Sequence, residues 1–596
     1  MKLAYLCKYV PVELPESMGI EMVRMTPDVT DFERADQLLH PNLCSFIKAA
    51  LEEYAAGDYD GIVLTNCCDS SRRLYDCIRE EFPERFSHLL DVPRMMTKEA
   101  SALYADAVGG LAEHLEKYTG RTFEEDRLRH LLKQTETGPD ASAQEDAAVH
   151  LILIGARIGA AVRQMIREYD VMTVADLTCT ETERRYLVGE DEPLKEAYAS
   201  ALLNQFPCMR MADIGERMRR LQEVRDRADG ILYHTMKFCD MYSYEFASLN
   251  RDETLPVLKI DTDSTPQAAG QIRTRLEAFF ESILQARGLP PEKIRKVKLP
   301  EGAGEDGNEE SMFWKKKENS VRAVKKRRGS GPVRKEDIRV VGIDSGSTST
   351  NAVLINGDRE ILSSVVIRTG SKSIVSAEDA YRQVVEKAGV RPEDVNLLIS
   401  TGYGRVNLDF ADRDLTEISC HGRGANYFNP EVRTILDIGG QDSKAIRIDQ
   451  EGNVLDFAMN DKCAAGTGRF LEMMASTLSV SLDELGPLSL DWKEDIDISS
   501  MCSVFAESEV ISLIADNKEK ADIAHGVHKS IASRAVSLMK RVGMDEGFMM
   551  TGGVAKNQGA VREIEKKLGH HLYICENPEI VGAVGAALFG LDELLS

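Results

Sequence analysis

A glycine-rich turn in the C-terminal half carries side chains suited to phosphate chemistry. In VVGIDSGSTSTNAVL, Asp344 is predicted to end a strand, and Gly346, Ser347, Thr348 and Thr350 form the turn that follows. Glycine lets the backbone approach a phosphate group closely, while hydroxyl and N–H groups donate to its oxygens. A plain polar turn has the same composition, so this segment alone does not establish a nucleotide site.

A second acidic turn repeats this plan about ninety residues later. In LDIGGQDS, Asp437 is predicted to end a strand before Gly439 and Gly440, and Gln441 and Asp442 follow. Two facing acidic turns hold Mg²⁺ through waters and orient an attacking water, which phosphoryl transfer requires. The candidate catalytic residues are therefore Asp344, Asp437, Gln441 and Asp442, and which of them positions the water stays open.

A third segment, FMMTGGVAKNQG, offers two glycines at a strand end and Asn557 at the start of a helix, which suits packing on adenosine. Three such elements in this order are far more specific than one. The predicted ATP-binding residues are Gly346, Ser347, Thr348, Thr350, Gly439, Gly440, Gly552, Gly553, Lys556 and Asn557.

The elements around these turns predict the domain organisation. The two strand–turn–strand units predict an internally duplicated nucleotide clamp of the actin/Hsp70/sugar-kinase (ribonuclease H-like) type over residues 338–596. A charged segment over 296–337, acidic and then basic, is typical of a linker.

Before the linker, short buried runs alternate with amphipathic helical stretches, a pattern that favours parallel α/β layers. GIVLT (61–65), HLILIG (150–155), GILYHT (230–235) and LPVLKID (255–261) are the predicted strands. The fold class predicted is therefore α/β, with two Rossmann-like domains over 1–145 and 146–295 preceding the ATPase domain.

Charge and composition exclude some functions. The net charge of −24 argues against nucleic acid as a partner, because phosphate binding requires a concentrated basic surface. The N-terminal segment lacks the apolar core of a signal peptide, and no apolar run approaches the length of a membrane span. We expect a cytoplasmic protein without a membrane partner, in which the twelve cysteines are buried thiols or metal ligands rather than disulfides.

The C-terminal part, about 337–596, resembles the ATP-dependent activators of 2-hydroxyacyl-CoA dehydratases and the related benzoyl-CoA reductase ATPase subunits. The motifs that carry the resemblance are TGYGR (401–405), EISCHGRGA (417–425), DIGGQDSK, NDKCAAGTGRF (460–470), CSVFAESEVISL (502–513) and TGGVAKN. A sugar kinase is the weaker interpretation, because the cysteine motifs have no role there.

Cys463 and Cys502 are each predicted to begin a helix, where the helix dipole favours a thiolate. A [4Fe–4S] cluster normally takes four cysteines, so two per chain make half a site. A twofold homodimer completes it, and the resemblance implies the same bridging cluster. On spacing alone, both would be buried structural cysteines, which is how we interpret Cys420, in a loop-like context, and Cys575, in a strand-like one.

Residues 1–290 resemble the iron–sulfur subunits of 2-hydroxyacyl-CoA dehydratases and the double-cubane cluster proteins, through motifs such as HPNLCSFIKAALEE, TNCCDSSRRLYD and MKFCDMYSYE. Cys44, Cys68 and Cys239 best match the single-cluster dehydratase pattern. Each α/β unit offers three thiols, which favours a double cubane ([8Fe–9S]) held by Cys7, Cys44, Cys68, Cys179, Cys208 and Cys239. The sequence leaves open whether this half holds one cubane or two and whether Cys67 or Cys68 is the ligand. Cys77 is interpreted as a packing residue.

Together the resemblances imply ATP- and Mg²⁺-dependent, low-potential electron transfer from the bridging cluster to the N-terminal cluster. Reduced ferredoxin or flavodoxin is the expected donor, and a dehydratase-type subunit is a candidate partner. The transferred electrons would support a reduction or a 2-hydroxyacyl-CoA dehydratase-type reaction. The sequence does not identify the substrate. A redox or nucleotide sensor without turnover and a small-molecule kinase are the alternatives.

Overall fold

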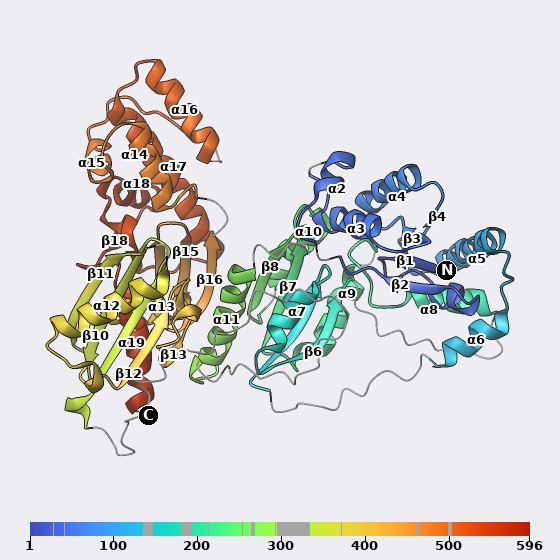
Figure 1. The fold of residues 1–596 in the computed structure, drawn as a ribbon, viewed down its shortest axis with the longest axis horizontal. Helices are drawn as coiled ribbons and strands as arrows, with labels where there is room; N and C mark the ends of the chain where they lie inside the picture. The colour runs from blue at the N-terminus through green and yellow to red at the C-terminus, as the bar shows by residue number, and fades with distance from the viewer. Residues whose placement is uncertain are drawn as a thin grey trace. The chain divides into compact units, whose positions relative to one another are not determined.

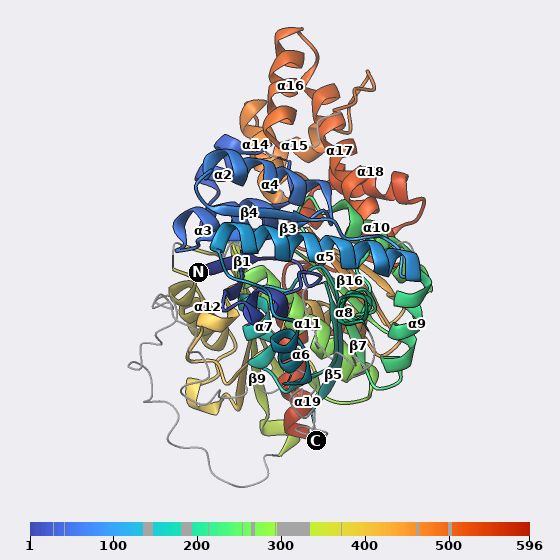
Figure 2. The same ribbon diagram turned by 90° about the vertical axis from the view of Figure 1, so that its right-hand side faces the viewer.

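The computed structural model of the chain divides into two compact units, which are described separately (Figures 1 and 2). The first comprises Met1–Leu276 and Ile294–Ala303, and the second comprises Glu277–Lys293 and Gly304–Ser596. The structure describes residues 1–27, 29–40, 42–134, 147–179, 193–211, 214–252, 254–263, 269–291, 294, 334–370, 372–460, 464–498 and 503–595.

The first unit contains two four-stranded sheets in which all neighbouring strands are parallel. Their orders are β2-β1-β3-β4 and β6-β5-β7-β8, so the second sheet repeats the connectivity of the first. The strands are β1 (Lys2–Tyr5), β2 (Glu21–Arg24), β3 (Gly61–Thr65), β4 (Phe86–Leu90), β5 (Val149–Gly155), β6 (Val171–Thr178), β7 (Gly230–Met236) and β8 (Val257–Thr262).

Helices connect these strands, because parallel neighbours require crossover connections. The central strands β3 and β7 are buried along their whole length, as expected where helices cover both faces of a sheet. The helices are α1 (Glu13–Ser17), α2 (Glu33–Leu38), α3 (Ser45–Ala56), α4 (Asp69–Glu81), α5 (Lys98–Thr119), α6 (Glu125–Gln134), α7 (Ala160–Arg167), α8 (Leu194–Leu203), α9 (Ile214–Arg225) and α10 (Asp240–Asp252). Helix α11 (Ala269–Ala286) begins in this unit and belongs to the second unit from Glu277 onward.

The second unit contains two five-stranded mixed sheets with the same topology. Their orders are β11-β10-β9-β12-β13 and β16-β15-β14-β17-β18, and in each the first three strands pair antiparallel and the last three parallel. The strands are β9 (Arg339–Ser345), β10 (Ser349–Asn356), β11 (Ile361–Arg368), β12 (Leu397–Thr401), β13 (Arg413–Asp414), β14 (Thr434–Ile438), β15 (Ser443–Ile448), β16 (Val454–Asn460), β17 (Phe548–Thr551) and β18 (Leu572–Tyr573).

Eight α-helices of the described chain follow the linker, and α14 to α18 gather at one end of the unit in both views (Figures 1 and 2). The first sheet packs against α12 on one face and α19 on the other. The helices are α12 (Ser373–Lys387), α13 (Glu417–Phe428), α14 (Gly468–Thr477), α15 (Leu482–Leu488), α16 (Ser503–Ala515), α17 (Lys520–Arg541), α18 (Gln558–Leu568) and α19 (Val581–Leu595).

Helix α13 packs between the two sheets of this unit. Its Cys420 joins the hydrophobic cluster of the first sheet and α19, whereas Ile418 and Ala425 join the cluster on the second sheet. Cys420 is therefore in a buried helix, and the loop-like context predicted for it is wrong. Glycines lower helix propensity, but a Cβ at Gly424 would overlap the Val581 carbonyl, so glycine allows α13 and α19 to pack closely.

These sheets confirm the predicted mixed α/β fold with parallel sheets. The predicted strand GIVLT coincides with β3, and the other three strands predicted before the linker differ from β5, β7 and β8 by one or two residues at an end. No helix of the described chain is both long enough and apolar enough to cross a membrane.

Candidate functional site

Asp344 and Asp437 occupy equivalent positions in the two sheets of the second unit. Each is the next-to-last residue of its strand, β9 or β14, and each carboxyl group is buried. Asp344 pairs with Thr401 of β12, and Asp437 pairs with Thr551 of β17 in the same way. The internal duplication therefore places two acidic groups at corresponding strand ends, as the turn motifs predicted.

Two buried cations neutralise Asp437. Lys444 Nζ lies 3.2 Å from Asp437 Oδ2, and His421 Nε2 lies 3.3 Å from Asp437 Oδ1. His421 Nδ1 also donates to the Glu417 carbonyl at 2.8 Å, so both ring nitrogens have acceptors. The Thr551 hydroxyl donates to Asp437 Oδ1 at 2.9 Å, which completes the carboxylate's contacts in the described chain.

Lys444 connects Asp437 to two further carboxylates. Its Nζ lies 2.8 Å from Asp442 Oδ2 and 3.4 Å from Glu417 Oε1. Lys444, His421 and Glu417 are not among the predicted site residues, although all three stand in the quoted motifs. A signal was available, since a buried strand-end carboxylate requires a cationic partner.

The titration behaviour of these groups follows from the contacts. Burial raises the pKa of Asp344 to about 6, against the opposing charges of His421 and Lys444. Burial acts in the same direction on Asp437, but His421 and Lys444 outweigh it and hold its pKa well below the usual range. Burial would lower the pKa of His421, yet Asp437 and Asp344 raise it to about 9. At neutral pH, Asp437 is therefore an anion paired with an imidazolium.

The two glycine turns lie against each other. Gly346 N donates to Ser349 O at 3.0 Å in the first turn, and Gly439 N donates to Asp442 O at 3.0 Å in the second. A Cβ at Gly440 would overlap the Thr348 hydroxyl, so only glycine permits this approach.

Two hydroxyl groups at the first turn fit a phosphate ligand. The buried Thr348 Oγ1 and Ser345 Oγ have no hydrogen-bond partner in the described chain. A buried hydroxyl is normally satisfied, so these two atoms are suited to phosphate oxygens. Thr350, predicted in the same turn, instead lies in β10 and shares a 2.8 Å hydrogen bond with Thr369.

The third predicted segment forms a turn at the end of β17. Gly552 has a positive φ of 83° and packs on the Ile438 carbonyl, where a side chain would clash. Asn557 caps α18 through a 3.0 Å bond from Ala560 N. Lys556 forms an ion pair with Glu579, and the Glu579 carbonyl accepts from Asn351 of β10, so this turn is joined to the first sheet.

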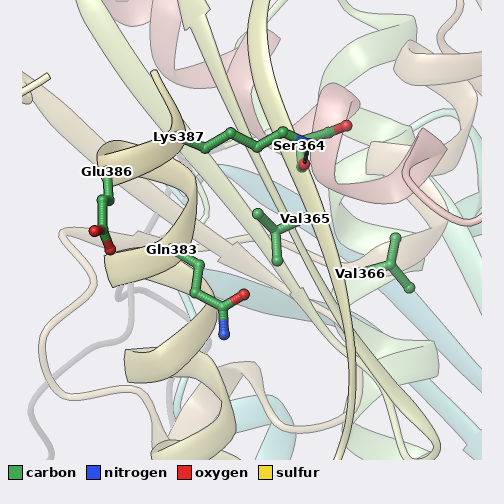
Figure 3. A pocket seen from close by; sticks show the side chains of 6 residues that line it. All are labelled: Ser364, Val365, Val366, Gln383, Glu386 and Lys387. Carbon is green, nitrogen blue, oxygen red and sulfur yellow. Dashed lines mark hydrogen bonds between the residues drawn. The ribbon is translucent and has the colours of Figure 1, made fainter. Parts of the chain in front are cut away.

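An open groove between β11 and α12 is separate from this acidic centre (Figure 3). Lys387 crosses one end of it and donates to the Ser364 carbonyl at 3.0 Å. None of its lining residues belongs to the predicted nucleotide set, so we do not assign the groove to ATP. The lining is Ser364, Val365, Val366, Gln383, Glu386 and Lys387.

In the first unit, cysteines from both sheets associate in hydrogen-bonded or electrostatic contact. Cys7, which follows β1, is hydrogen-bonded to Cys67, and Cys67 is in turn hydrogen-bonded to Cys68. Cys44, which caps α3, is hydrogen-bonded to Cys239 beyond β7.

Cys179 and Cys208 complete this group. Cys179 interacts electrostatically with Cys208 and Cys7, and Cys208 interacts with Cys7. Both also interact with the buried Lys8. Lys8 Nζ donates to the Phe206 carbonyl at 2.5 Å, which ties the segment before Cys208 to the strand that precedes Lys8. Each of the six predicted ligands is thus hydrogen-bonded to another thiol or within electrostatic range of one, with Cys67 as a seventh member, whereas Cys77 lines a separate groove between α2 and α4.

Burial and contacts with neighbouring thiols raise the pKa of several of these cysteines. Burial raises the pKa of Cys179 to about 11, and the hydrogen bond to Cys68, with burial, raises that of Cys67 to about 12. The ten described cysteines form no disulfide. In the described chain no three His, Cys, Asp or Glu side chains surround one point closely enough for a single metal ion. A cubane differs, since its cysteines bind different iron atoms.

Two predicted ligands, Cys463 and Cys502, lie outside the described residues. The chain around them is described from Ala464 and from Ser503, where α16 begins. Cys575 is buried just after β18, as a structural cysteine would be.

Two protein-family models match the chain. Residues 341–590 match the BadF/BadG/BcrA/BcrD ATPase family. Residues 7–144 and 130–283 match 2-hydroxyglutaryl-CoA dehydratase, D-component.

Curated relatives match one part of the chain at nearly their full length. The 2-hydroxyisocaproyl-CoA dehydratase activator of Clostridioides difficile is 43% identical over 42% of this chain and 95% of its own. The activator of lactoyl-CoA dehydratase of Anaerotignum propionicum is 45% identical over 42% of this chain and 97% of its own. The (R)-2-hydroxyglutaryl-CoA dehydratase activating ATPase of Acidaminococcus fermentans is 42% identical over 42% of this chain and 96% of its own.

Proposed function

The chain belongs to the BadF/BadG/BcrA/BcrD ATPase family, and from that premise we propose that it is an ATP-driven electron-transfer enzyme. Residues 338–596 hydrolyse ATP, and the free energy of hydrolysis drives electron transfer to an iron–sulfur site held by residues 1–295. The observation that carries the proposal is the presence in one polypeptide of an activator-type ATPase and a thiol cluster within a dehydratase-component match. Activator relatives are named for dehydratases, which supports ATP-dependent activation of such a component.

We place ATP between the two glycine turns, in the manner of the actin, Hsp70 and sugar-kinase ATPases. The Thr348 and Ser345 hydroxyls and the turn N–H groups bind the phosphates. Asp344 and Asp437 would hold a Mg²⁺ that neutralises phosphate charge, and Gln441 and Asp442 are the candidates for orienting water. Lys444 and His421 hold Asp437 ionised, so that it is ready to accept a cationic or proton-donating ligand.

Iron–sulfur clusters supply single-electron chemistry when they are bound. Cys463 and Cys502 of two chains would hold one shared [4Fe–4S] group in a homodimer, with reduced ferredoxin or flavodoxin as donor. Cys7, Cys44, Cys67 or Cys68, Cys179, Cys208 and Cys239 would hold the acceptor, as one cubane or a double cubane. The buried Lys8 lies beside these thiols and offsets the negative charge of the thiolates.

The tether between the parts has an energetic role. A linker of suitable length gives an effective concentration of about a millimolar, so docking becomes an intramolecular event. For one electron, roughly 59 mV of added driving force requires about 1.4 kcal/mol, which ATP hydrolysis can supply several times over. The electron then serves a reduction or a 2-hydroxyacyl-CoA dehydratase-type reaction, in which a separate dehydratase-type subunit is a possible participant.

The proposal is tested by iron and sulfide content with ATPase activity, after anaerobic purification of the full chain and of a Cys463→Ala/Cys502→Ala variant. About ten irons per chain falling to about eight in the variant indicates a double cubane plus a shared cluster, at four irons per cubane. About six falling to about four indicates a single cubane. ATP hydrolysis without iron would contradict the redox proposal and favour a small-molecule kinase. Clusters without ATP-dependent electron transfer would favour a sensor.

A further inference from the structure

Helix α11 carries a buried polar stripe. Glu277, Glu281 and Gln285 are four residues apart, a spacing that places them on one face of the helix. Their exposed fractions are 5%, 3% and 7%. Carboxylates are rarely buried without partners, so this stripe must face donors.

Each member of the stripe bonds a residue far along the sequence, within the second compact unit. Glu277 forms a buried ion pair with Arg405. Glu281 accepts from Thr416 N at 3.1 Å and from the hydroxyls of Thr416 and Ser419. Gln285 Oε1 accepts from Val454 N at 3.1 Å, and Ala278 lies in the hydrophobic cluster that contains Ile418 and Ala425 of α13.

These partners belong to segments that build the acidic centre. Arg405 closes the turn after β12, in which Gly402 packs directly on Asp344. Thr416 is the N-cap of α13, and its hydroxyl also accepts from Ser419 N. The first turn of α13 carries Glu417, and the next residues bring His421 to Asp437. Glu281 therefore fixes the start of the helix that places two charged groups of the site.

The stripe also lies in an unexpected part of the chain. The dehydratase-component match extends to residue 283, so Glu277 and Glu281 fall inside it. The activator match begins only at residue 341. Two residues from the first matched segment thus bond side chains and backbone groups of the second.

We propose that Glu277 and Glu281 are positioning residues of the ATPase site, supplied by helix α11 rather than by residues 338–596. The inference rests on the proposed ATP hydrolysis and adds to it that the working ATPase unit begins at α11. Glu281 acts through α13 on His421 and Glu417, and Glu277 acts through Arg405 on the turn beside Asp344. The contacts given above for Glu277 and Glu281 are to Arg405, Thr416 and Ser419, which support the site rather than bind the phosphates, so removal of either carboxylate is expected to change kcat more than the KM for ATP.

The test uses the full chain purified anaerobically, with kcat and KM for ATP measured where circular dichroism shows each variant folded. Glu281→Ala is expected to lower kcat at least about tenfold with less than about a threefold change in KM. Glu281→Gln keeps an acceptor for Thr416 N and is expected to recover most of the activity. Ser282→Ala is the matched control, because the Ser282 hydroxyl donates only to Phe279 O of the same helix at 2.8 Å in the described chain.

A milder pair keeps the inference testable where Glu281→Ala does not fold. Ser419→Ala removes a hydroxyl that donates to Glu281, so it is expected to lower kcat in the wild-type background and to have a smaller effect in the Glu281→Gln background, which makes the pair non-additive. Wild-type kcat in folded Glu281→Ala, additive effects in the pair, or an equal loss in Ser282→Ala would each overturn the inference. A wild-type chain that does not hydrolyse ATP would instead contradict the proposed function itself.

Discussion

Asp344 and Asp437 stand at equivalent strand ends of a duplicated unit, yet only Asp437 is paired with a lysine and a histidine at hydrogen-bonding range. The duplicated unit contains two equivalent carboxyl groups, and the charges around them give these groups different pKa values. Asp344 has a pKa of about 6 because burial disfavours its anion, whereas Asp437 is held ionised.

This asymmetry predicts opposite effects of the two asparagine substitutions on stability. Asp437→Asn leaves Lys444 and His421 without their shared anion, which is expected to destabilise the ATPase unit by about 3–5 kcal/mol. Asp344→Asn resembles the neutral form of a carboxyl group that burial already favours, so the stability change is expected to be below about 1 kcal/mol. Both are expected to lose ATP hydrolysis. Denaturation of the full chain with and without ATP measures both properties, and equal destabilisation would contradict the assignment.

The close approach of Gly440 to Thr348 predicts a loss of nucleotide binding. In Gly440→Ala the added methyl group would displace Thr348 and separate the two turns. ATP affinity is expected to fall at least about tenfold, measured by calorimetric titration. Gly370→Ala is the control, since its Cβ would lie 3.7 Å from the nearest atom, Ser376 Oγ. Wild-type affinity in Gly440→Ala would show that ATP does not bind between the turns.

His421 predicts a pH dependence of stability. Its pKa rises from 6.5 to about 9 on folding, so protonation stabilises the folded state. This contribution is fully present below about pH 6.5 and is lost as the pH rises through about 9. Its upper limit is about 3 kcal/mol, at about 1.4 kcal/mol per pKa unit.

The measurement compares the full chain with His421→Gln by urea denaturation from pH 6 to pH 10. Trp492 fluorescence in a Trp314→Phe background reports on the ATPase unit, because Trp492 stacks on His525 there. The stability difference between the two proteins is expected to be largest at the acid end and to shrink above about pH 9. A difference that grows with pH would contradict the protonated histidine.

The thiol contacts predict which cysteines hold iron in the first unit. Cys44→Ala and Cys7→Ala are expected to lose about four irons per chain, because each removes a ligand of a cubane. Cys77→Ala is the matched control, since Cys77 lines the groove between α2 and α4, and it is expected to keep the full iron content. Comparing Cys67→Ala with Cys68→Ala decides between the two neighbours. Equal iron loss in Cys77→Ala would mean that cysteine replacement disturbs the fold generally.

Much of the acidic centre could be predicted from the sequence because its turns are local. Asp344, Gly346, Asp437 and Gly440 stand in short segments whose glycines and acidic residues indicate strand ends. His421 and Lys444 escaped prediction as site residues because burial of a carboxylate, and hence its need for cations, is a tertiary property.

The contacts of α11 with distant residues could not be predicted from the sequence. The spacing of Glu277, Glu281 and Gln285 is visible, but Arg405 and Thr416 stand 128 and 135 residues from their partners. No local pattern indicates such contacts. Helix α13 escaped prediction for a related reason, since its glycines lower helix propensity and serve close packing on α19.

The central claim is that ATP drives electrons into the N-terminal cluster of the same chain. The direct measurement is the electron paramagnetic resonance spectrum of the anaerobic, dithionite-reduced protein before and after Mg²⁺ and ATP are added. ATP-driven electron transfer predicts a further reduced cluster signal that requires ATP, is absent with a non-hydrolysable analogue, and is absent in Cys463→Ala/Cys502→Ala although that variant still hydrolyses ATP. An identical spectrum with and without ATP, in a protein that hydrolyses ATP and holds its full iron content, would contradict the claim.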